Sequence, residues 1–282
     1  MPNVSCFARN PRFLERSILG RFKMEPETFD DHVEEESVEA KSFFTRLGGV
    51  FFSPGEAFTE IGRAPRLVIP IIALLLLSAF SGWYLAQKID TQAASRAALE
   101  QAVKQGRITE DQMNQQMAMA SRAAGPILIA GSVFSVLIVC LVIAGYGKLF
   151  SAIKGAENSY KSLLTVTFYA MLAVSIVSTV LIIIILQIRG RQYMGAADVN
   201  TIVASNLGSW IESAVGTNAM PKFIMRLANA VDIFNIWIIA LLSIGFSAIS
   251  KKLKTATAAI WLGGAYAIIS IITAAIRSVF GT

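Results

Sequence analysis

Five long apolar stretches, each free of charged residues, dominate the pattern of hydrophobic and polar positions along this chain. They cover residues 67–87, 126–146, 163–188, 233–249 and 256–276. Each has about the length that a helix needs to cross a hydrocarbon core of ~30 Å. Because a chain inside a bilayer must satisfy its own backbone N–H and C=O groups, we expect each stretch to be a helix. The pattern therefore predicts an all-α, polytopic membrane protein built on a five-transmembrane-helix bundle.

The composition agrees with burial in a membrane. Hydrophobic residues make up 54% of the chain and charged residues only 16%, whereas a soluble domain carries about 25% charged residues. The formal net charge is +6, but no basic patch with interleaved aromatic residues lies outside the predicted spans. We therefore assign the positive charge to membrane topology and expect no nucleic-acid partner.

Basic residues gather in the connections that would share one side of the membrane if the helices alternate. That side receives Arg63, Arg66, Lys148, Lys154, Lys161, Lys251, Lys252 and Lys254. In the two long loops of the other side, basic residues are sparser and mixed with acids. By the positive-inside rule the N-terminus is cytoplasmic and the C-terminus is extracytoplasmic.

The first 40 residues differ from the rest of the chain. Residues 1–23 are basic and lack the apolar core of a secretory signal, whereas residues 24–40 are acidic and contain no Lys or Arg. A block of like charge cannot bury apolar surface, so we expect a disordered tail over 1–40 and a membrane domain over 41–282. Translation can start at Met1 or at Met24. The acidic block is either a solvated leader, which we prefer, or a docking tail for a basic partner.

Two short helices are predicted just before the first span. Apolar residues recur at helical spacing over 43–51, which is typical of a helix lying in the membrane interface. A second helix would start at Ser53, with Pro54 in its first turn and Glu56 completing a capping box. We expect it to present Phe58 to the bilayer. The alternative is a soluble amphipathic helix packed on another protein.

The two outer loops also predict helices. The first loop, residues 88–125, reads as an extracytoplasmic helical hairpin, with one helix that stops at Gly106 and another that starts with a capping box at Thr109. This second helix can run directly into the second span, or Pro126 can bend or break it. The second loop, residues 189–231, predicts an interfacial helix leading into the fourth span.

The sequence contains no recognisable catalytic chemistry. Transporters coupled to protons usually carry an ionisable group inside the membrane, and the predicted spans have none. The motifs G-x-S-x-G, H-E-x-x-H and the P-loop are missing. His32 has no second His or Cys nearby, and Cys6 and Cys140 form no C-x-x-C motif. We therefore expect a protein that is not an enzyme and has no catalytic site, metal or cofactor.

Small residues in the fifth span predict a close helix contact. Gly263 and Ala267 form a small-xxx-small pair, which allows two helices to approach closely. The neighbour can belong to the same protomer, which we prefer, or to a second copy of the chain.

Three stretches carry a resemblance to a known family. The first is Phe51-Phe52-Ser53-Pro54-Gly55-Glu56-Ala57-Phe58, the second is the short glycine-bearing connection over 145–161, and the third is Asp232 to Trp237 followed by Gly245 and a short basic turn. Over about residue 43 to the C-terminus the chain resembles the Yip family of integral membrane proteins. The founding members of this family are Ypt/Rab-GTPase-interacting proteins. The chain is most similar to the bacterial-type Yip domain.

This resemblance implies a membrane protein with five spans and a cytoplasmic N-terminus, integral to a bacterial cytoplasmic (inner) membrane. Eukaryotic members are similar to adaptors for vesicle traffic that bind small GTPases and one another, but their longer N-terminal regions and loop motifs are not evident here. The implied partners are the lipid bilayer, an unknown protein and a second copy in a homo-oligomer. The candidate partner or interface contacts are Phe51, Phe52, Pro54, Phe58, Asp232, Trp237 and Gly245. For Asp232 and Trp237 the plainer interpretation is helix capping and interface anchoring.

The leading hypothesis is a non-enzymatic integral membrane adaptor or scaffold, acting in membrane organisation or trafficking-like processes. Two alternatives remain open: a transporter or permease subunit whose path is lined by Ser, Thr and backbone, and a membrane-shaping protein that acts through its interfacial helices. A water-accessible cavity among the spans would favour the transporter.

Overall fold

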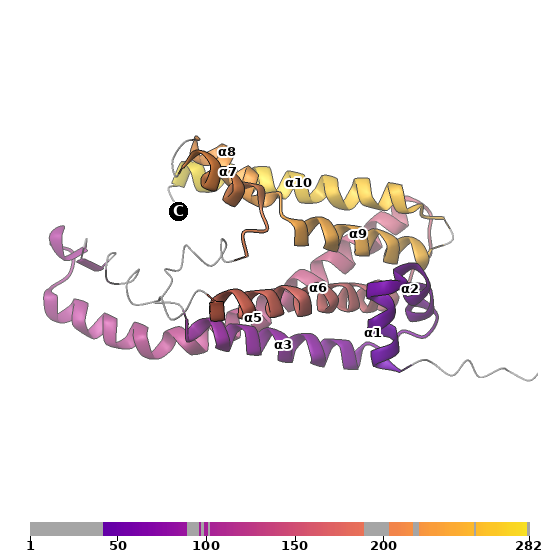
Figure 1. Cartoon of the computed structure of the whole chain (residues 1–282), viewed down its shortest axis with the longest axis horizontal. Coiled ribbons are helices and arrows are strands. Elements are labelled where there is room, and N and C mark those ends of the chain that lie inside the picture. The colour runs from indigo at the N-terminus through magenta and orange to yellow at the C-terminus, as the bar shows by residue number, and fades with distance from the viewer. Residues whose placement is uncertain are drawn as a thin grey trace, which may run out of the picture. The chain divides into compact units, whose positions relative to one another are not determined.

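The computed structural model describes residues 42–88, 96, 99–100, 102–188, 203–216, 220–250 and 252–280. In chain order the named helices are α1 (Phe43–Phe52), α2 (Pro54–Arg63), α3 (Val68–Ala86), α5 (Glu110–Ile153), α6 (Tyr160–Ile188), α7 (Leu207–Val215), α8 (Lys222–Ala230), α9 (Ile233–Ala248) and α10 (Thr255–Phe280) (Figure 1). Within these ranges the strand-like pairing is a single isolated bridge between Asn206 and Asp232. The described residues therefore confirm the all-α prediction. The predicted tail over 1–40 lies outside them.

Four of these helices are long and apolar enough to cross a membrane. They are α3, α5, α6 and α10. The predicted fourth span corresponds to α9, which is apolar but has 16 residues. At 1.5 Å per residue its length is ~24 Å, somewhat less than a typical hydrocarbon core. The polytopic membrane architecture is confirmed, with four long apolar helices in the described residues and one shorter apolar helix beside them.

The helix that starts at Thr109 continues without interruption through the second span. The hydroxyl of Thr109 accepts from the Gln112 N–H and the Gln112 side chain accepts from the Thr109 N–H, so the predicted capping box is confirmed. Pro126 lies inside the 44-residue helix and does not end it. Proline removes one backbone hydrogen bond, a loss that membrane helices tolerate when neighbouring groups compensate.

The first helix of the predicted hairpin is described only near its end. Gly106 has φ +66, a left-handed conformation that glycine adopts without steric cost. Its N–H donates to the Val103 carbonyl and the Arg107 N–H donates to the Ala102 carbonyl. These two bonds form a Schellman motif, so the predicted helix stop at Gly106 is confirmed. Most of the preceding residues, from 89 to 101, lie outside the described part of the chain.

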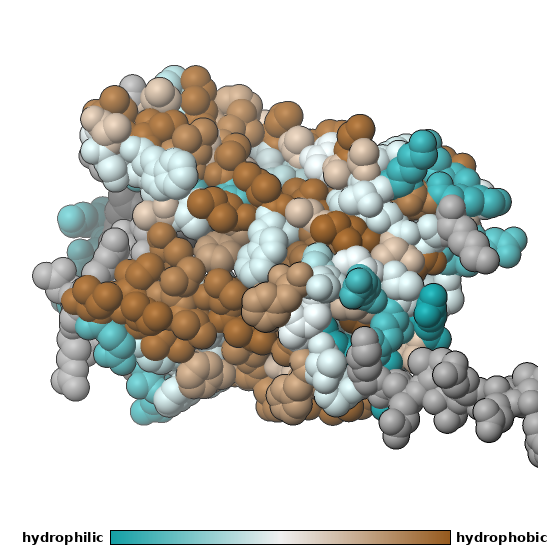
Figure 2. All heavy atoms as spheres, turned by 45° about the vertical axis from the view of Figure 1, so that its right-hand side comes forward, coloured by the Kyte–Doolittle hydropathy of each residue, from teal (hydrophilic) through white to brown (hydrophobic). Residues whose placement is uncertain are grey.

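The core of the bundle is built around α6. Residues 163–170 of α6 are all buried, and α6 packs against α1, α2, α3, α5 and α9. A helix that is surrounded by others is expected to be apolar on all sides, as this one is. α3 packs against α5, and α10 packs against α9. Apolar side chains that do not reach the core face outward along the helices (Figure 2).

Glycines mark several close contacts between helices of the bundle. A Cβ atom on Gly245 of α9 would lie 2.3 Å from Val166 Cγ1 of α6, and one on Gly82 of α3 would lie 2.5 Å from Ser132 Oγ of α5. Such short distances require glycine at these crossings. The predicted packing of Gly263 within the protomer is not observed, because no atom of the described residues lies within 4 Å of a Cβ built there. Sequence spacing identifies a small residue but does not identify which face is covered.

The short connections lie together at one end of the bundle. The Lys252 Nζ donates to the Gly155 carbonyl at 2.7 Å, and the Ser162 hydroxyl donates to the Gly62 carbonyl at 3.5 Å. The first contact joins the turn after α9 to the connection after α5, and the second joins the start of α6 to the end of α2. The helices α7 and α8 lie at the opposite end, next to the end of α10 (Figure 1). The basic connections thus share one end, as alternating helices require.

Candidate functional site

A hairpin of α1 and α2 covers the end of the bundle that carries the short connections. Ser53 joins the two helices: its N–H donates to the Gly49 carbonyl and its carbonyl accepts from the Ala57 N–H. Pro54 occupies the first turn of α2, as predicted. The predicted side-chain cap is wrong, because the Ser53 side chain makes no capping hydrogen bond. The backbone of Ser53 both ends α1 and begins α2, and its dihedral angles (φ −144, ψ 62) differ from those of a usual N-cap.

A buried arginine fixes this hairpin. Arg46 of α1 is 2% exposed. Its Nε lies 3.2 Å from Glu60 Oε1 of α2, and its Nη1 donates to the Ala64 carbonyl at 2.8 Å. Burying a charge costs free energy unless it is paired and hydrogen-bonded, so these contacts hold α1 and α2 together. Sequence reasoning missed this role. The sequence feature that could have indicated this role is the position of Arg46 one helical turn before Val50, on the face of α1 that periodicity predicts to be buried.

Four of the seven predicted contact residues lie in one internal packing surface. Phe51 of α1 packs against Trp237 of α9 with ring centroids 6.0 Å apart. Phe58 of α2 is fully buried next to Gly245, with its Cδ2 3.2 Å from the position of a Cβ there. The expectation that Phe58 faces the bilayer is therefore wrong, because the apolar side of α2 packs on α6 and α9 instead.

The other three predicted residues lie elsewhere. Phe52 is 89% exposed at the end of α1, and Pro54 beside it is half-buried. Phe44, at the start of the same helix, is 79% exposed. Asp232 lies at the opposite end of the molecule, before α9. The hairpin thus combines a fixed internal face with exposed aromatic side chains.

We call the surface around this hairpin the basic end. Its exposed basic residues are Arg63, Arg66, Lys148, Lys154, Lys161, Lys252 and Lys254. Figure 2 shows hydrophilic side chains gathered at this end of the molecule, beside the apolar surface of the helices. The acids near it are Glu56, Glu60 and Glu157, and Glu60 is paired with Arg46. The basic end therefore has an excess of positive charge, and it also carries the exposed Phe44 and Phe52.

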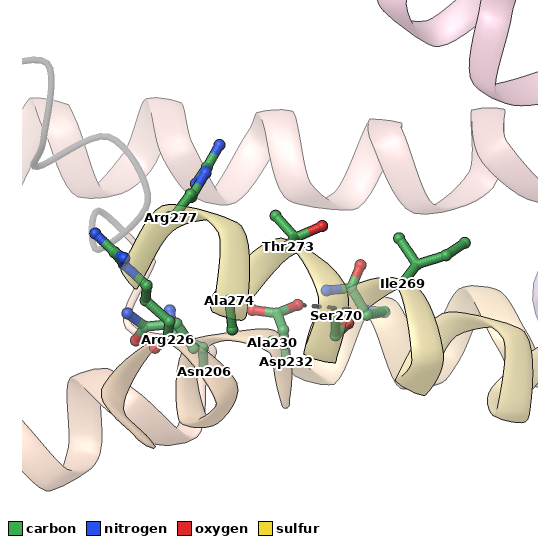
Figure 3. A pocket seen from close by; sticks show the side chains of 11 residues that line it. Asn206, Arg226, Ala230, Asp232, Ile269, Ser270, Thr273, Ala274 and Arg277 are labelled. Carbon is green, nitrogen blue, oxygen red and sulfur yellow. Dashed lines mark hydrogen bonds between the residues drawn. The ribbon is translucent and has the colours of Figure 1, made fainter. Parts of the chain in front are cut away.

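A polar pocket of about 370 Å³ lies at the opposite end of the bundle. Helices α8, α9 and α10 and the residue before α7 form it (Figure 3). It is lined by Asn206, Arg226, Asn229, Ala230, Asp232, Asn235, Ile269, Ser270, Thr273, Ala274 and Arg277. Sequence analysis did not find this pocket, because its residues come from three segments that are far apart along the chain.

Hydrogen bonds fix one wall of the polar pocket. Asp232 Oδ1 accepts from the Phe234 N–H at 2.8 Å and the Asn235 N–H at 3.3 Å, which confirms the predicted helix cap. The Asn235 side chain donates to the Tyr266 hydroxyl at 2.8 Å, and that hydroxyl donates to the Ala230 carbonyl at 2.7 Å. The start of α9 is therefore tied to both α8 and α10.

An apolar groove of about 640 Å³ lies between α5, α9 and α10. It is lined by Val142, Ile143, Tyr146, Ile238, Ile239, Leu242, Ile260, Trp261, Leu262, Gly264, Ala265, Tyr266, Ile268 and Ile269. The Tyr146 hydroxyl is satisfied, since it donates to the Trp261 carbonyl at 3.1 Å. Within the described residues, no three His, Cys, Asp or Glu side chains lie close enough to hold a metal ion.

Comparison with known protein families identifies the domain. The family model of the Yip1 domain matches residues 48–276, from the middle of α1 to near the end of α10. No curated protein and no solved structure matches the chain. The matched region contains the second half of α1, all of α2, α3, α5, α6 and α9, and most of α10, and it covers more than half of the sequence. The chain therefore belongs to the Yip family, as a protein with a Yip1 domain.

Proposed function

We propose that this Yip-family protein is a non-enzymatic membrane adaptor or scaffold that presents its α1–α2 hairpin to a protein partner. The observation that carries the proposal is the contrast within α1. Arg46 is buried in contacts that fix the helix, whereas Phe44 and Phe52 are 79% and 89% exposed. Exposed aromatic side chains on a rigid support are typical anchors of protein interfaces.

The proposed topology has five spans. The helix α9 is included because it packs beside α6 and α10, and because its start lies at the polar pocket and its end at the basic end. Its ~24 Å can span the bilayer if the membrane thins locally or if flanking polar residues reach the interface. The N-terminus and the basic end are then cytoplasmic, and the C-terminus and the hairpin over 88–125 are extracytoplasmic. The membrane is the bacterial cytoplasmic (inner) membrane.

The packing of the core favours an adaptor over a transporter. Buried apolar residues from α1, α2, α3, α5, α6, α9 and α10 form one continuous cluster. Two deeply buried hydroxyl groups bond to their own helix: Thr167 donates to the Leu163 carbonyl at 2.8 Å and Ser243 donates to the Ile239 carbonyl at 2.6 Å. Hydroxyls used in this way are not available to line a path for a substrate.

Crosslinking in the membrane tests this proposal. Full-length protein, a form starting at Lys41 and the double variant F44A/F52A are crosslinked, extracted in mild detergent and analysed by mass spectrometry. The matched control is F134A/I138A, which removes two exposed apolar side chains from the membrane-facing part of α5.

We expect full-length protein and the control to retain a stoichiometric partner and F44A/F52A to lose it. Loss of the partner from the form starting at Lys41, with F44A/F52A unaffected, would place the contact in the acidic tail and contradict the role of the hairpin. A single species without partner in every form would contradict the adaptor function.

A further inference from the structure

The structure also contains a site for a membrane ligand, separate from the basic end. We propose that the polar pocket and the apolar groove form one binding site for an anionic phospholipid. Its phosphate group lies between Arg226 and Arg277, and one acyl chain lies in the groove along α10. This site is independent of the adaptor role, because it lies at the opposite end of the bundle and shares no residue with the α1–α2 hairpin.

The two cavities lie next to each other along one helix. The α10 residues that line the groove fall between 260 and 269, although Gly263 and Ala267 are not among them; those that line the pocket fall between 269 and 277, and Ile269 lines both. At 1.5 Å per residue these segments measure ~14 Å and ~12 Å. Tyr266 lies beside the junction, where its hydroxyl bonds to Asn235 and Ala230 of the pocket. The lining thus changes from apolar to polar toward the end of α10, in the same order as a phospholipid from tail to headgroup.

The charge of the pocket favours an anion. Arg226 comes from α8 and Arg277 from α10, and in Figure 3 both side chains lie at the same end of the pocket, away from Ile269. Arginine is well suited to phosphate because its guanidinium can form two parallel hydrogen bonds. The acid among the described lining residues is Asp232, and its carboxylate accepts bonds from backbone N–H groups at the start of α9 and from the Ser205 hydroxyl. Among the described lining residues, two arginines therefore stand against one carboxylate, and that carboxylate is already engaged.

The groove favours a lipid over a soluble anion. Its volume of about 640 Å³ and its apolar lining suit a hydrocarbon chain, and a soluble phosphate would use none of it. Ile260, Ile268 and Ile269 are 74%, 60% and 60% exposed, so the groove opens toward the surrounding bilayer. Gly264 lines the groove, and no atom of the described residues lies within 4 Å of a Cβ built on it. An acyl chain can therefore enter sideways from the membrane and cover these residues.

Native mass spectrometry of the full chain tests the headgroup contact. Protein in micelles is titrated with phosphatidylglycerol or with phosphatidylcholine of the same acyl chains, and the bound fraction is measured for R226Q, R277Q and K222Q. Lys222 is the matched control, because it is an exposed residue on the same helix as Arg226 and does not line the pocket. We expect each arginine variant to bind phosphatidylglycerol about tenfold more weakly than the unmodified protein does. The affinity of K222Q for phosphatidylglycerol, and the affinity of every variant for phosphatidylcholine, should stay unchanged. Equal losses in R226Q and K222Q would show attraction to surface charge and overturn the proposal.

Two neighbouring glycines test the acyl-chain contact. The variant G264L fills the groove, whereas G263L adds the same side chain at a position that does not line it. We expect G264L to lose phosphatidylglycerol and G263L to retain it. Equal binding by both would show that the groove is unused, and displacement of the lipid by millimolar inorganic phosphate would identify a soluble-anion site. Either result overturns the proposal.

A crosslinking measurement on the unmodified protein covers the case in which a variant fails to fold. Phosphatidylglycerol with a photoreactive group on its acyl chain should label peptides from residues 260–269 of α10 above the level seen on α3. Equal labelling of α3 and α10 would overturn the proposal. F44A/F52A should leave lipid binding unchanged, which separates this result from that of the adaptor test.

Discussion

Replacing the buried arginine of the α1–α2 hairpin should release the hairpin from the bundle. The variant R46M keeps an unbranched apolar side chain in the site but removes the ion pair with Glu60 and the hydrogen bond to the Ala64 carbonyl. Breaking a buried ion pair by removing one partner costs about 3–5 kcal/mol. The Glu60 side chain is 18% exposed and can regain some hydration, so we expect the lower end of this range, about 3 kcal/mol.

Hydrogen exchange measures this loss where it occurs. If α1 and α2 open as one unit, a cost of about 3 kcal/mol should accelerate exchange of their protected amides about 100-fold. Amides in α6 should be affected much less, because the bundle has other contacts. The double variant R46M/E60Q should recover part of the protection, since it also removes the negative charge that Arg46 balances in the native protein.

The control for this experiment is R66M. Arg66 is exposed between α2 and α3, so its replacement should change local stability by no more than about 0.5 kcal/mol. Unchanged exchange of α1 and α2 in R46M would refute the argument that Arg46 fixes the hairpin. Equal acceleration in R46M and R66M would show that loss of net positive charge, and not of the buried contacts, is responsible.

Three further changes test the packing of the bundle by thermal unfolding in detergent. G245A should destabilise the protein by about 1–3 kcal/mol because its Cβ would meet Val166 at 2.3 Å. The control G264A should be neutral or slightly stabilising, and equal effects of the two variants would contradict the close crossing at Gly245. D232A should lower the free energy of unfolding by about 1 kcal/mol because the α9 cap is lost, whereas D232N should lower it much less. Equal losses of stability in the two variants would show that the charge of Asp232, and not its capping bond, matters. Y266F should cost about 1–3 kcal/mol by leaving the Ala230 carbonyl and the Asn235 side chain without this partner, and unchanged stability would contradict the bonds seen there.

Local signals in the sequence were sufficient for the helices and several of their ends. The capping box at Thr109, the glycine stop at Gly106 and the cap at Asp232 each depend on residues within one turn, so their sequence is enough to predict them. Charge-free apolar stretches identified the four long apolar helices and the shorter α9, because burial in lipid excludes charge regardless of the packing partner. The prediction for Ser53 was wrong because the same residue also ends the preceding helix.

Contacts between distant segments could not be predicted in this way. The amphipathic pattern of α2 indicates an apolar face, but whether Phe58 meets lipid or protein depends on where α6 and α9 lie. The polar pocket joins α8, the start of α9 and the end of α10, and no spacing in the sequence relates Arg226 to Arg277. The position of Arg46 on the buried face of α1 was a usable signal, because a charge at such a position requires a partner.

The most direct test of the account is to determine on which side of the membrane each end of α9 lies. Single cysteines are introduced at Ser53, Lys222, Lys252 and Ser278 after Cys6 and Cys140 are replaced, and a membrane-impermeant maleimide is applied from either side. The account predicts that S53C and K252C react only from the cytoplasmic side and that K222C and S278C react only from the outside. Reaction of K222C and K252C from the same side would show that α9 does not cross the membrane, and would contradict the five-span topology on which the separation of the two sites depends.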